Sequence, residues 1–202
     1  MAMEILYEVH NNLYVNLTNR CSCTCTFCLR QDRDKMGKSG SLWLEHEPTA
    51  QEAINEFSKF HREDYSEVVF CGFGEPTEAF DVLKEVAAFV KKEWKCPVRI
   101  NTNGQGSLIN GRNIAPELEG LIDTVSISLN HPDPEKYQEI VRSRFGEEGY
   151  RGMLAFAGEC VKYVPHVVMT TVDTTITKEE EERCRKICED LGVVYRIREW
   201  EA

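Results

Sequence analysis

The sequence lacks any apolar run of the roughly 20 residues that a membrane-spanning helix needs. Its opening residues, Met1 to Glu4, carry neither the basic stretch nor the apolar segment of a secretory signal. Basic residues are also few: the chain has 24 Lys and Arg but 34 Asp and Glu. The resulting formal net charge of −10 disfavours general binding to nucleic-acid phosphates. We therefore expect a cytoplasmic protein with no membrane attachment and no general nucleic-acid binding.

The chain also lacks linkers rich in Pro, Gly or Ser, low-complexity segments and internal repeats. Its 202 residues match the size of a single domain, and we expect residues 1–202 to form one. An eight-fold (β/α) barrel takes about 250 residues, so this length leaves room for six strand–helix units.

Cysteine, by contrast, is plentiful: nine residues, four of them between positions 21 and 28. Three of these, Cys21, Cys25 and Cys28, stand at Cys-x3-Cys-x2-Cys spacing, and three thiolates from one loop can each bind one iron of a cubic [4Fe-4S] cluster. Because a fourth ligand at matching spacing is not evident, one iron is left open to chelation by a small molecule that carries an amine and a carboxylate. Cys23 is a spare thiol inside this loop.

A structural zinc site is the alternative for the same loop, because Cys21, Cys23, Cys25 and Cys28 supply four sulfurs. Structural zinc sites, however, usually draw their ligands from two separated pairs. A non-catalytic zinc or redox module of this kind predicts one zinc ion and colourless protein. The other close pair, Cys184 and Cys188 in the last expected helix, has no flanking cysteines and more often reflects small buried residues than a second cluster.

Short β-type runs alternate with helical patterns along the chain. Ile5–Val9 and Leu13–Leu17 predict an N-terminal hairpin, with an asparagine of the intervening His10–Asn12 segment at the positive φ of the turn. Five further strands are expected at Glu67–Cys71, Pro97–Thr102, Thr124–Asn130, Val167–Val172 and Val193–Arg198. Such alternation predicts an α/β fold with a parallel sheet. The chain length favours a partial (β/α)6 TIM-type barrel over a flat doubly wound sheet, although periodicity does not separate the two.

Helix starts follow from capping patterns. Thr49 and Thr177 each precede a glutamate by three residues, which is the pattern of a capping box. A short helix is expected over Ile114–Ile122. Leu29–Glu47 shows no clear period and predicts a long irregular excursion.

Polar motifs follow the ends of the expected strands, where the active sites of parallel α/β folds form. The segment Gly72–Pro76 follows one of these strands and carries a carboxylate, Glu75; by itself it also fits an ordinary strand-to-helix turn in which Pro76 starts the helix. Ser126 and Ser128 share one face of their strand, and such hydroxyls suit a ribose. Asn103, at the end of the preceding strand, could bind a ribose in the same way.

Two arginines, Arg196 and Arg198, lie on one face of the last expected strand together with Trp200. They either anchor a carboxylate or phosphate of a substrate or pair with surface carboxylates such as Glu199. We favour the surface pairing slightly.

The cysteine spacing, with an aromatic residue immediately before the last cysteine, resembles the signature of the radical S-adenosylmethionine (radical SAM) superfamily. The segment Gly72–Pro76 is similar to the Gly-Gly-Glu-Pro segment of that family, with Phe73 in place of one glycine. The resemblance implies a [4Fe-4S] cluster on the three spaced cysteines, S-adenosylmethionine cleaved to a 5′-deoxyadenosyl radical that abstracts hydrogen, and a partial barrel. It also implies these cofactor-binding residues: Phe27, Gly74, Glu75, Asn103, Ser126 and Ser128.

A finer resemblance covers nearly the whole chain. The Leu6–Val9 hairpin, Asn16–Cys21, Phe70–Thr77 and Arg196–Glu199 look like the small radical SAM proteins associated with the TatD family of nucleases. This implies a TatD-family nuclease or other protein partner and an electron donor such as a flavodoxin or ferredoxin, without naming a substrate. Two alternatives stay open: an activase of a glycyl-radical enzyme, which predicts a stable large partner, and a 7-carboxy-7-deazaguanine synthase-like enzyme, which predicts turnover of a pterin.

Overall fold

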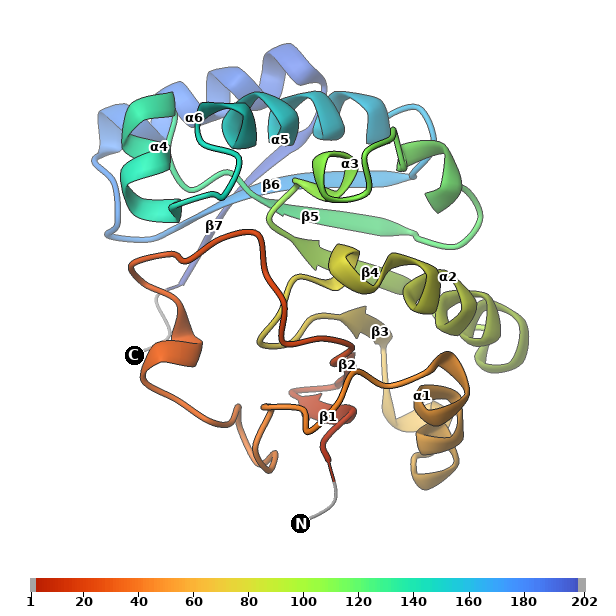
Figure 1. The fold of residues 1–202 in the computed structure, drawn as a ribbon. Helices are drawn as coiled ribbons and strands as arrows, with labels where there is room; N and C mark the ends of the chain where they lie inside the picture. The colour runs from red at the N-terminus through yellow and green to blue at the C-terminus, as the bar shows by residue number, and fades with distance from the viewer. Residues whose placement is uncertain (1–2, 200–202) are drawn as a thin grey trace.

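The structure, a computed structural model, describes residues 3–199, and its centre is a seven-stranded sheet (Figure 1). The strands lie in the order of the sequence, from β1 at one edge to β7 at the other. β1 pairs antiparallel with β2, and every later pair of neighbours is parallel. The strands are β1 (Leu6–Val9), β2 (Asn12–Val15), β3 (Glu67–Phe70), β4 (Val98–Thr102), β5 (Thr124–Ser128), β6 (His166–Val172) and β7 (Val194–Arg198).

Helices cover one side of the sheet, at the right and top of Figure 1. Their bounds are α1 (Ala50–Glu56), α2 (Phe80–Phe89), α3 (Gly106–Ile109), α4 (Pro134–Val141), α5 (Glu147–Cys160) and α6 (Lys178–Leu191). Short 3₁₀ turns lie at Leu29–Gln31, Phe57–Lys59, Arg62–Asp64, Pro76–Ala79 and Ala115–Leu118, and Val90–Trp94 is π-helical. None of the helices between residues 3 and 199 is long and apolar enough to cross a bilayer.

Both capping boxes form as expected. Thr49 and Thr177 each accept a hydrogen bond from the backbone N–H of the glutamate three residues later, and each glutamate carboxylate accepts one in return. These reciprocal bonds satisfy backbone donors that would otherwise lack partners in the first helical turn, and so fix where α1 and α6 begin.

The main core lies between the sheet and the helices. Leu13 and Val15 of β2 point into it and are at most 1% exposed, whereas Tyr14 between them packs on the opposite face. Val125 and Ile127 of β5 enter the core in the same way. Helices therefore take the apolar face of the sheet, and the face turned away from them is left for polar side chains.

The α/β fold, the parallel sheet and the N-terminal hairpin are confirmed. The sheet is open in the described residues, because β1 and β7 stand at opposite edges and do not pair with each other. This strand order shows that the sheet is not closed but does not by itself show a partial barrel, which stays a prediction.

Three local features differ from expectation. The positive φ of the hairpin turn falls on His10 (φ +53°) rather than on an asparagine. Ile114–Ile122 contains only a 3₁₀ turn, because the backbone is already extended at Glu119 (ψ 128°) and Gly120 turns the chain at φ +72°. The four-residue helix Gly106–Ile109 was not expected, since one turn is too short for a period to show in the sequence.

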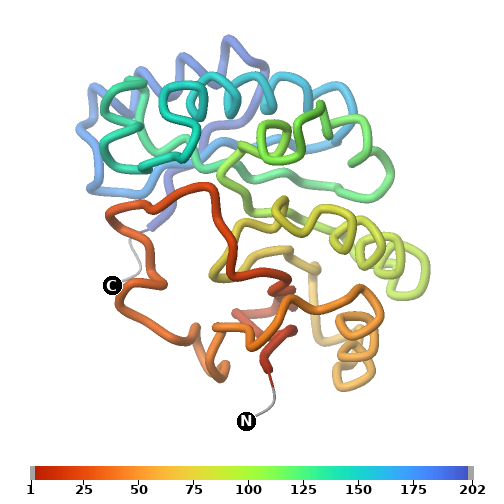
Figure 2. The backbone as a smooth tube through the Cα atoms, in the orientation of Figure 1, coloured from red at the N-terminus to blue at the C-terminus, as the bar shows by residue number. Residues whose placement is uncertain are grey.

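The excursion after the cysteines contains the 3₁₀ turn Leu29–Gln31 and is otherwise irregular, as expected. It runs along the edge where the parallel strands end, at the left of Figures 1 and 2. Its far end is fastened by Asn19, whose Oδ1 accepts from the Leu44 backbone N–H (3.0 Å) and whose Nδ2 donates to the Leu44 carbonyl (2.8 Å). Leu42 packs with Tyr7 in a small apolar cluster apart from the main core.

Candidate functional site

The cysteine loop, residues 18–28, follows β2 and lies against the segment that follows β3. The backbone N–H of Glu75 donates to the carbonyl of Arg20 (2.8 Å). A Cβ atom on Gly74 would stand 2.2 Å from the carbonyl oxygen of Thr18, so this approach of two backbones requires glycine. The two motifs that the sequence places at neighbouring strand ends are therefore in direct contact.

The other side of the loop is held by the connection between α4 and α5. The backbone N–H of Arg144 donates to the carbonyl of Ser22 (2.8 Å), and Cys23 forms an isolated antiparallel bridge with Ser143. The loop backbone is thus fixed between two segments that follow different strands.

Gln105 is a site residue that sequence reasoning missed. It is fully buried, its Oε1 accepts from the hydroxyls of Ser22 (2.8 Å) and Ser143 (2.9 Å), and its Nε2 donates to the Tyr137 hydroxyl (3.1 Å). One side chain thereby joins the cysteine loop, α4 and the segment after α4. No local pattern marks it, because Ser22 lies 83 residues away in the sequence.

The four loop thiols occupy two environments. Cys21, Cys25 and Cys28 are half-buried, whereas Cys23 is 3% exposed and belongs to the main core. A hydrogen bond with Cys23, burial and the charge of Glu75 raise the pKa of Cys21. The hydrogen bond with Cys21 lowers the pKa of Cys23, but its hydrogen bond with Cys25 and its burial outweigh this and raise the pKa to about 12. Because metals bind the thiolate form, cluster formation at Cys21 would release this proton.

The donor set can be compared with the cluster that the spacing suggests. In residues 3–199, no group of three or more His, Cys, Asp or Glu side chains is already gathered closely enough to hold a metal ion. Three half-buried thiols on one backbone-anchored loop nevertheless supply the donors that a site-open cubic cluster takes. The residues fit the cluster in their chemistry, and binding would require their side chains to turn toward one point.

Glu75 is buried, and its carboxylate is engaged within the protein. Oε1 accepts from the hydroxyls of Thr77 and Thr102 (2.7 Å each) and from the Thr77 N–H (3.1 Å), while Oε2 accepts from the backbone N–H of Asn103 (2.7 Å). Burial raises the pKa of this carboxyl, and the hydrogen bonds act against that rise. The carboxylate ties the ends of β3 and β4 together, and its role toward an ammonium group stays a prediction.

Asn103 lies with the cysteine loop. Its Nδ2 donates to the Ser22 hydroxyl (2.9 Å) and lies 3.4 Å from Cys23 Sγ and 3.9 Å from Cys21 Sγ. The residue that the resemblance assigns to a ribose thus faces sulfur in this structure.

Ser126 and Ser128 lie on the sheet face opposite the helices, on the side of β5 away from Val125 and Ile127. Their neighbours on that face are polar as well. The register places Asn101 of β4 beside Ser126, and Thr170 of β6 beside Ser128. A band of hydroxyl and amide groups therefore crosses three strands, near the edge that carries the cysteine loop.

The last strand, β7, adds two positively charged residues, Arg196 and Arg198, to this polar band. Arg196 pairs in register with Thr170, and Arg198 follows two residues later on the same face. Both residues are exposed. Trp200, the expected third member of this face, lies outside the described residues.

The two aromatic residues of the expected site, Phe27 and Phe73, differ in how far they are buried. Phe27 is half-buried beside Cys28 in the loop. Phe73 is 7% exposed and packs edge-on against Trp43 of the excursion, with ring centroids 5.2 Å apart. The excursion therefore provides the packing that allows a phenylalanine at the position where the sequence comparison expects glycine.

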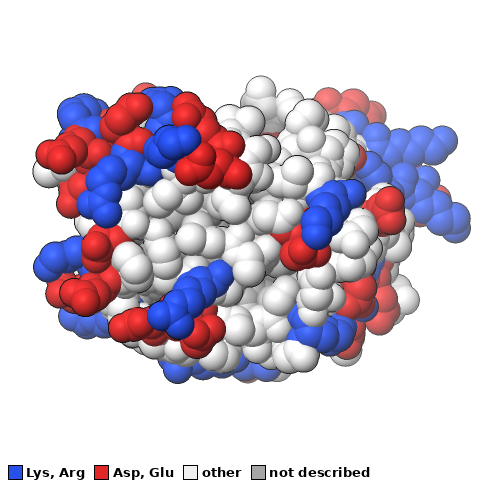
Figure 3. All heavy atoms as spheres, turned by 90° about the horizontal axis from the view of Figure 1, so that it is seen from above, with Lys and Arg blue, Asp and Glu red and all other residues white. Residues whose placement is uncertain are grey.

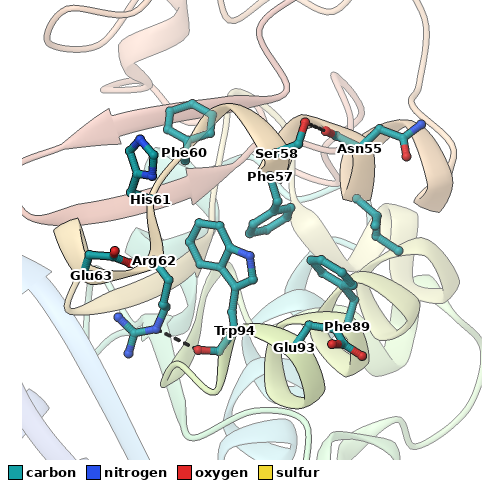
Figure 4. A pocket seen from close by; sticks show the side chains of 11 residues that line it. Asn55, Phe57, Ser58, Phe60, His61, Arg62, Glu63, Phe89, Glu93 and Trp94 are labelled. Atoms are coloured by element: carbon teal, nitrogen blue, oxygen red, sulfur yellow. Dashed lines mark hydrogen bonds between the residues drawn. The ribbon is translucent and has the colours of Figure 1, made fainter.

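A hollow among the described residues lies away from this site. It lies between α1 and the end of α2 and is walled by aromatic rings, including those of Phe57, Phe89 and Trp94, with no cysteine among its lining residues (Figure 4). In the view of Figure 3, Lys and Arg lie next to Asp and Glu over most of the drawn face, and a group of Lys and Arg gathers at its right edge. Because no cysteine lines the hollow, the strand ends are the candidate site for the thiol chemistry.

Comparison with known proteins identifies a family. Residues 15–191 match the family model described as radical SAM superfamily. GTP 3′,8-cyclase 2 of Mycobacterium tuberculosis is 26% identical over 195 residues, which cover 94% of this chain and 50% of that protein. Among solved structures, Streptococcus suis SuiB bound to precursor peptide SuiA superposes with a TM-score of 0.65 at 18% identity, covering 97% of this chain and 40% of that one. Native anSMEcpe with bound AdoMet gives a TM-score of 0.65 at 16% identity, with 92% and 50% covered.

These structural likenesses show the fold. The chain spans half or less of the length of these relatives.

Proposed function

This chain belongs to the radical SAM superfamily, and we propose that it holds a [4Fe-4S] cluster on Cys21, Cys25 and Cys28 and cleaves S-adenosylmethionine reductively. The observation that carries this proposal is the docking of the three-thiol loop against Gly74 and Glu75 at the ends of parallel strands. A cluster held there would supply the electron that breaks a carbon–sulfur bond of the sulfonium, which would give methionine and a 5′-deoxyadenosyl radical. That radical takes a hydrogen atom from a substrate.

Several groups of this chain suit the nucleotide. The strand-end backbone around Gly74, together with Glu75 Oε2, which accepts a single hydrogen bond, suits the methionine ammonium. The hydroxyls of Ser126 and Ser128 suit the ribose. Phe27 is assigned to the cofactor by the family resemblance alone.

We extend the proposal to the shape of the sheet. Cys71 follows β3, and Arg198 ends β7, four places along the sheet. The family resemblance favours a sheet that curves around its polar face and so brings these two strand ends closer together, which is the partial barrel expected from the sequence.

The substrate would meet this polar face. Arg196 lies at its end, exposed and in register with Thr170, and a guanidinium suits a carboxylate or phosphate. The mycobacterial relative is a GTP 3′,8-cyclase, so a nucleoside triphosphate is the first substrate to test. The electron would come from a donor such as a flavodoxin or ferredoxin. The TatD-family partner and the cytoplasmic location stay predictions, and the comparisons do not favour the activase or the deazaguanine synthase alternative.

Anaerobic reconstitution with iron and sulfide, followed by reduction with dithionite and chromatography for 5′-deoxyadenosine, tests the proposal. We expect wild-type protein to be brown, to hold about four irons per chain and to form the product. Cys25→Ala should lose colour and product, whereas Cys184→Ala, which alters a buried thiol of α6, should keep both. Wild-type protein that binds one zinc and stays colourless would overturn the proposal in favour of a zinc module.

A further inference from the structure

The outer rim of the cysteine loop lies at the surface. Thr24 and Thr26 are exposed, and Cys25 between them is half-buried. The backbone N–H of Thr26 donates to the Ile140 carbonyl (2.8 Å), and that of Thr24 donates to the Val141 carbonyl (3.2 Å). The end of α4 is therefore packed on the stretch of the loop that faces solvent. A protein that delivers an electron to this loop would approach it here.

The surroundings of this rim are basic, although the chain as a whole is acidic. Residues 18–38 hold five Arg and Lys but two Asp, and residues 140–146 hold two Arg and no acidic residue, whereas the formal net charge of the chain is −10. Three of these arginines, Arg20, Arg142 and Arg144, are exposed. The loop, the first part of the excursion and the connection after α4 thus carry positive charge within an acidic protein.

Two of the arginines are held in place by carboxylates of neighbouring segments. Arg20 donates through Nε (2.8 Å) and Nη2 (2.7 Å) to Glu47, and Nη1 of Arg144 pairs with Glu78 (3.1 Å). The Glu78 side chain is 4% exposed, whereas those of Arg20 and Arg144 are at least half exposed. Glu47 is exposed as well and offsets part of the charge. An approaching protein therefore meets guanidinium groups whose positions are already fixed.

Arg142 is the third cation of the rim, and the turn it occupies does not account for it. It ends α4 in the left-handed region (φ +50°), a conformation that glycine or asparagine adopts more readily. Its backbone carbonyl accepts from the N–H of Thr24 (3.3 Å), which fixes the residue against the loop. Among residues 3–199, its guanidinium has no ion-pair partner. A strained backbone position that presents an unpaired cation at a proposed redox site points to a function of that cation.

We propose that this rim, formed by Arg20, Arg142 and Arg144 around the cysteine loop, is the docking surface of an acidic one-electron carrier protein such as a flavodoxin. This inference rests on the proposed function, which needs one electron for each reduction of the cluster. The carrier loses one electron and the oxidised cluster gains it. Complementary charge speeds the encounter and sets the orientation of two proteins, and electron-transfer complexes are held by small interfaces, so a rim of three arginines suits such a partner.

The salt dependence of electron transfer distinguishes this rim from the charge of the whole molecule. Reconstituted protein is reduced with dithionite, freed of excess reductant and mixed anaerobically with oxidised acidic flavodoxin. The cluster then loses one electron, and the flavin gains it with one proton to form its coloured semiquinone. Two acidic proteins repel each other, so without a local basic surface the second-order rate constant would rise with salt. We expect it to fall between about 0.01 M and about 0.15 M salt, as the Debye length shortens from about 30 Å to about 8 Å. A rise overturns the inference.

A double variant locates the surface. Arg142→Asn suits the left-handed backbone, and Arg144→Gln can still donate to Glu78, so the pair removes two charges with little disturbance. Lys92→Gln/Lys162→Gln is the matched control, which removes two exposed lysines that follow α2 and α5. At low salt, we expect the arginine variant to transfer its electron about tenfold more slowly than wild type, and the control to match wild type. In about 1 M salt the difference should disappear.

Iron content and reduction by dithionite separate the outcomes. Both double variants should hold as much iron as wild type and be reduced fully by dithionite, because neither alters a proposed ligand. A loaded arginine variant that matches the wild-type rate at low salt overturns the inference, and so does equal slowing in the control. If the arginine variant takes up less iron, the salt dependence of wild type decides. Wild-type protein that takes up no cluster overturns the proposed function as well.

Discussion

The thiols of the cysteine loop and those of the last helix share one spacing in contrasting surroundings. Cys21 and Cys25 stand four residues apart on an irregular loop at the strand ends, and both are half-buried. Cys184 and Cys188 stand four apart on α6, at most 1% exposed in the main core. Burial, first among the causes, raises the pKa of each core thiol to about 12, so both stay neutral and pack as small apolar groups.

The difference shows that the backbone conformation decides whether two cysteines at Cys-x3-Cys spacing pack in the core or are available as metal ligands. On a helix, residues four apart lie on one face, and here that face is the buried one. On the loop, the same spacing comes with a third cysteine and with contacts to two strand-end segments. The predictions below test this contrast between an anchored loop and a packed core.

The largest effect is expected from a substitution that separates the cysteine loop from Gly74, the residue against which its backbone packs. Gly74→Ala would place a Cβ 2.2 Å from the Thr18 carbonyl oxygen, so we expect a loss of about 3 kcal/mol in unfolding free energy, at the upper end of overpacking costs, together with loss of cluster uptake. Gly158→Ala in α5 is the matched control, because its new Cβ meets nothing closer than 3.6 Å. Urea unfolding and iron content measure both effects, and equal stability in the two variants would refute the role given to Gly74.

Removing the buried anchor of the loop should have a smaller effect. Gln105→Leu leaves the hydroxyls of Ser22, Ser143 and Tyr137 without their shared partner, at a cost of about 2 kcal/mol. Gln51→Leu, at an exposed position of α1, should change the unfolding free energy by no more than about 0.5 kcal/mol. Thermal unfolding at matched pH compares the two, and a Gln105 variant as stable as the Gln51 variant would contradict the network.

The smallest effect concerns the core thiols in alkali. The pKa of Cys188 is raised from 9.0 to about 12, so between these pH values the unfolded chain loses a proton that the folded chain keeps. Folding stability should therefore fall as pH rises through this window and be unaffected by this thiol below about pH 8. Cys188→Ala should remove up to about 1.4 kcal/mol per pH unit from that fall. Urea titrations at pH 8 and pH 9.5, between which this thiol should account for about 0.8 kcal/mol, measure it, and parallel losses in wild type and variant would contradict it.

The sequence was a good guide wherever the cause of a structure is local. The capping glutamates after Thr49 and Thr177 and the period-two pattern of Thr124–Ser128 predicted their elements, because the partners lie within a few residues. The meeting of the cysteine loop with Gly74 could also be foreseen, since parallel strands bring their ends to one edge.

The remaining site features depend on contacts between distant segments. The sequence gives no sign that Gln105 is fully buried beneath Ser22. It also does not reveal that Glu75 already accepts four internal hydrogen bonds, or that Asn103 faces sulfur. Each is a polar group whose partner is chosen by tertiary packing, which a local pattern does not encode.

The last strand has a consequence for the behaviour of the protein in concentrated solution. Within residues 3–199, β7 has a neighbour on one side only, and a bare strand of this kind is a template on which a second chain can add. On one face of that strand Val194 is followed by Arg196 and Arg198. Two approaching copies would bring their Arg196 guanidiniums together, so we expect the charge that suits an anionic substrate also to disfavour fibrous self-association.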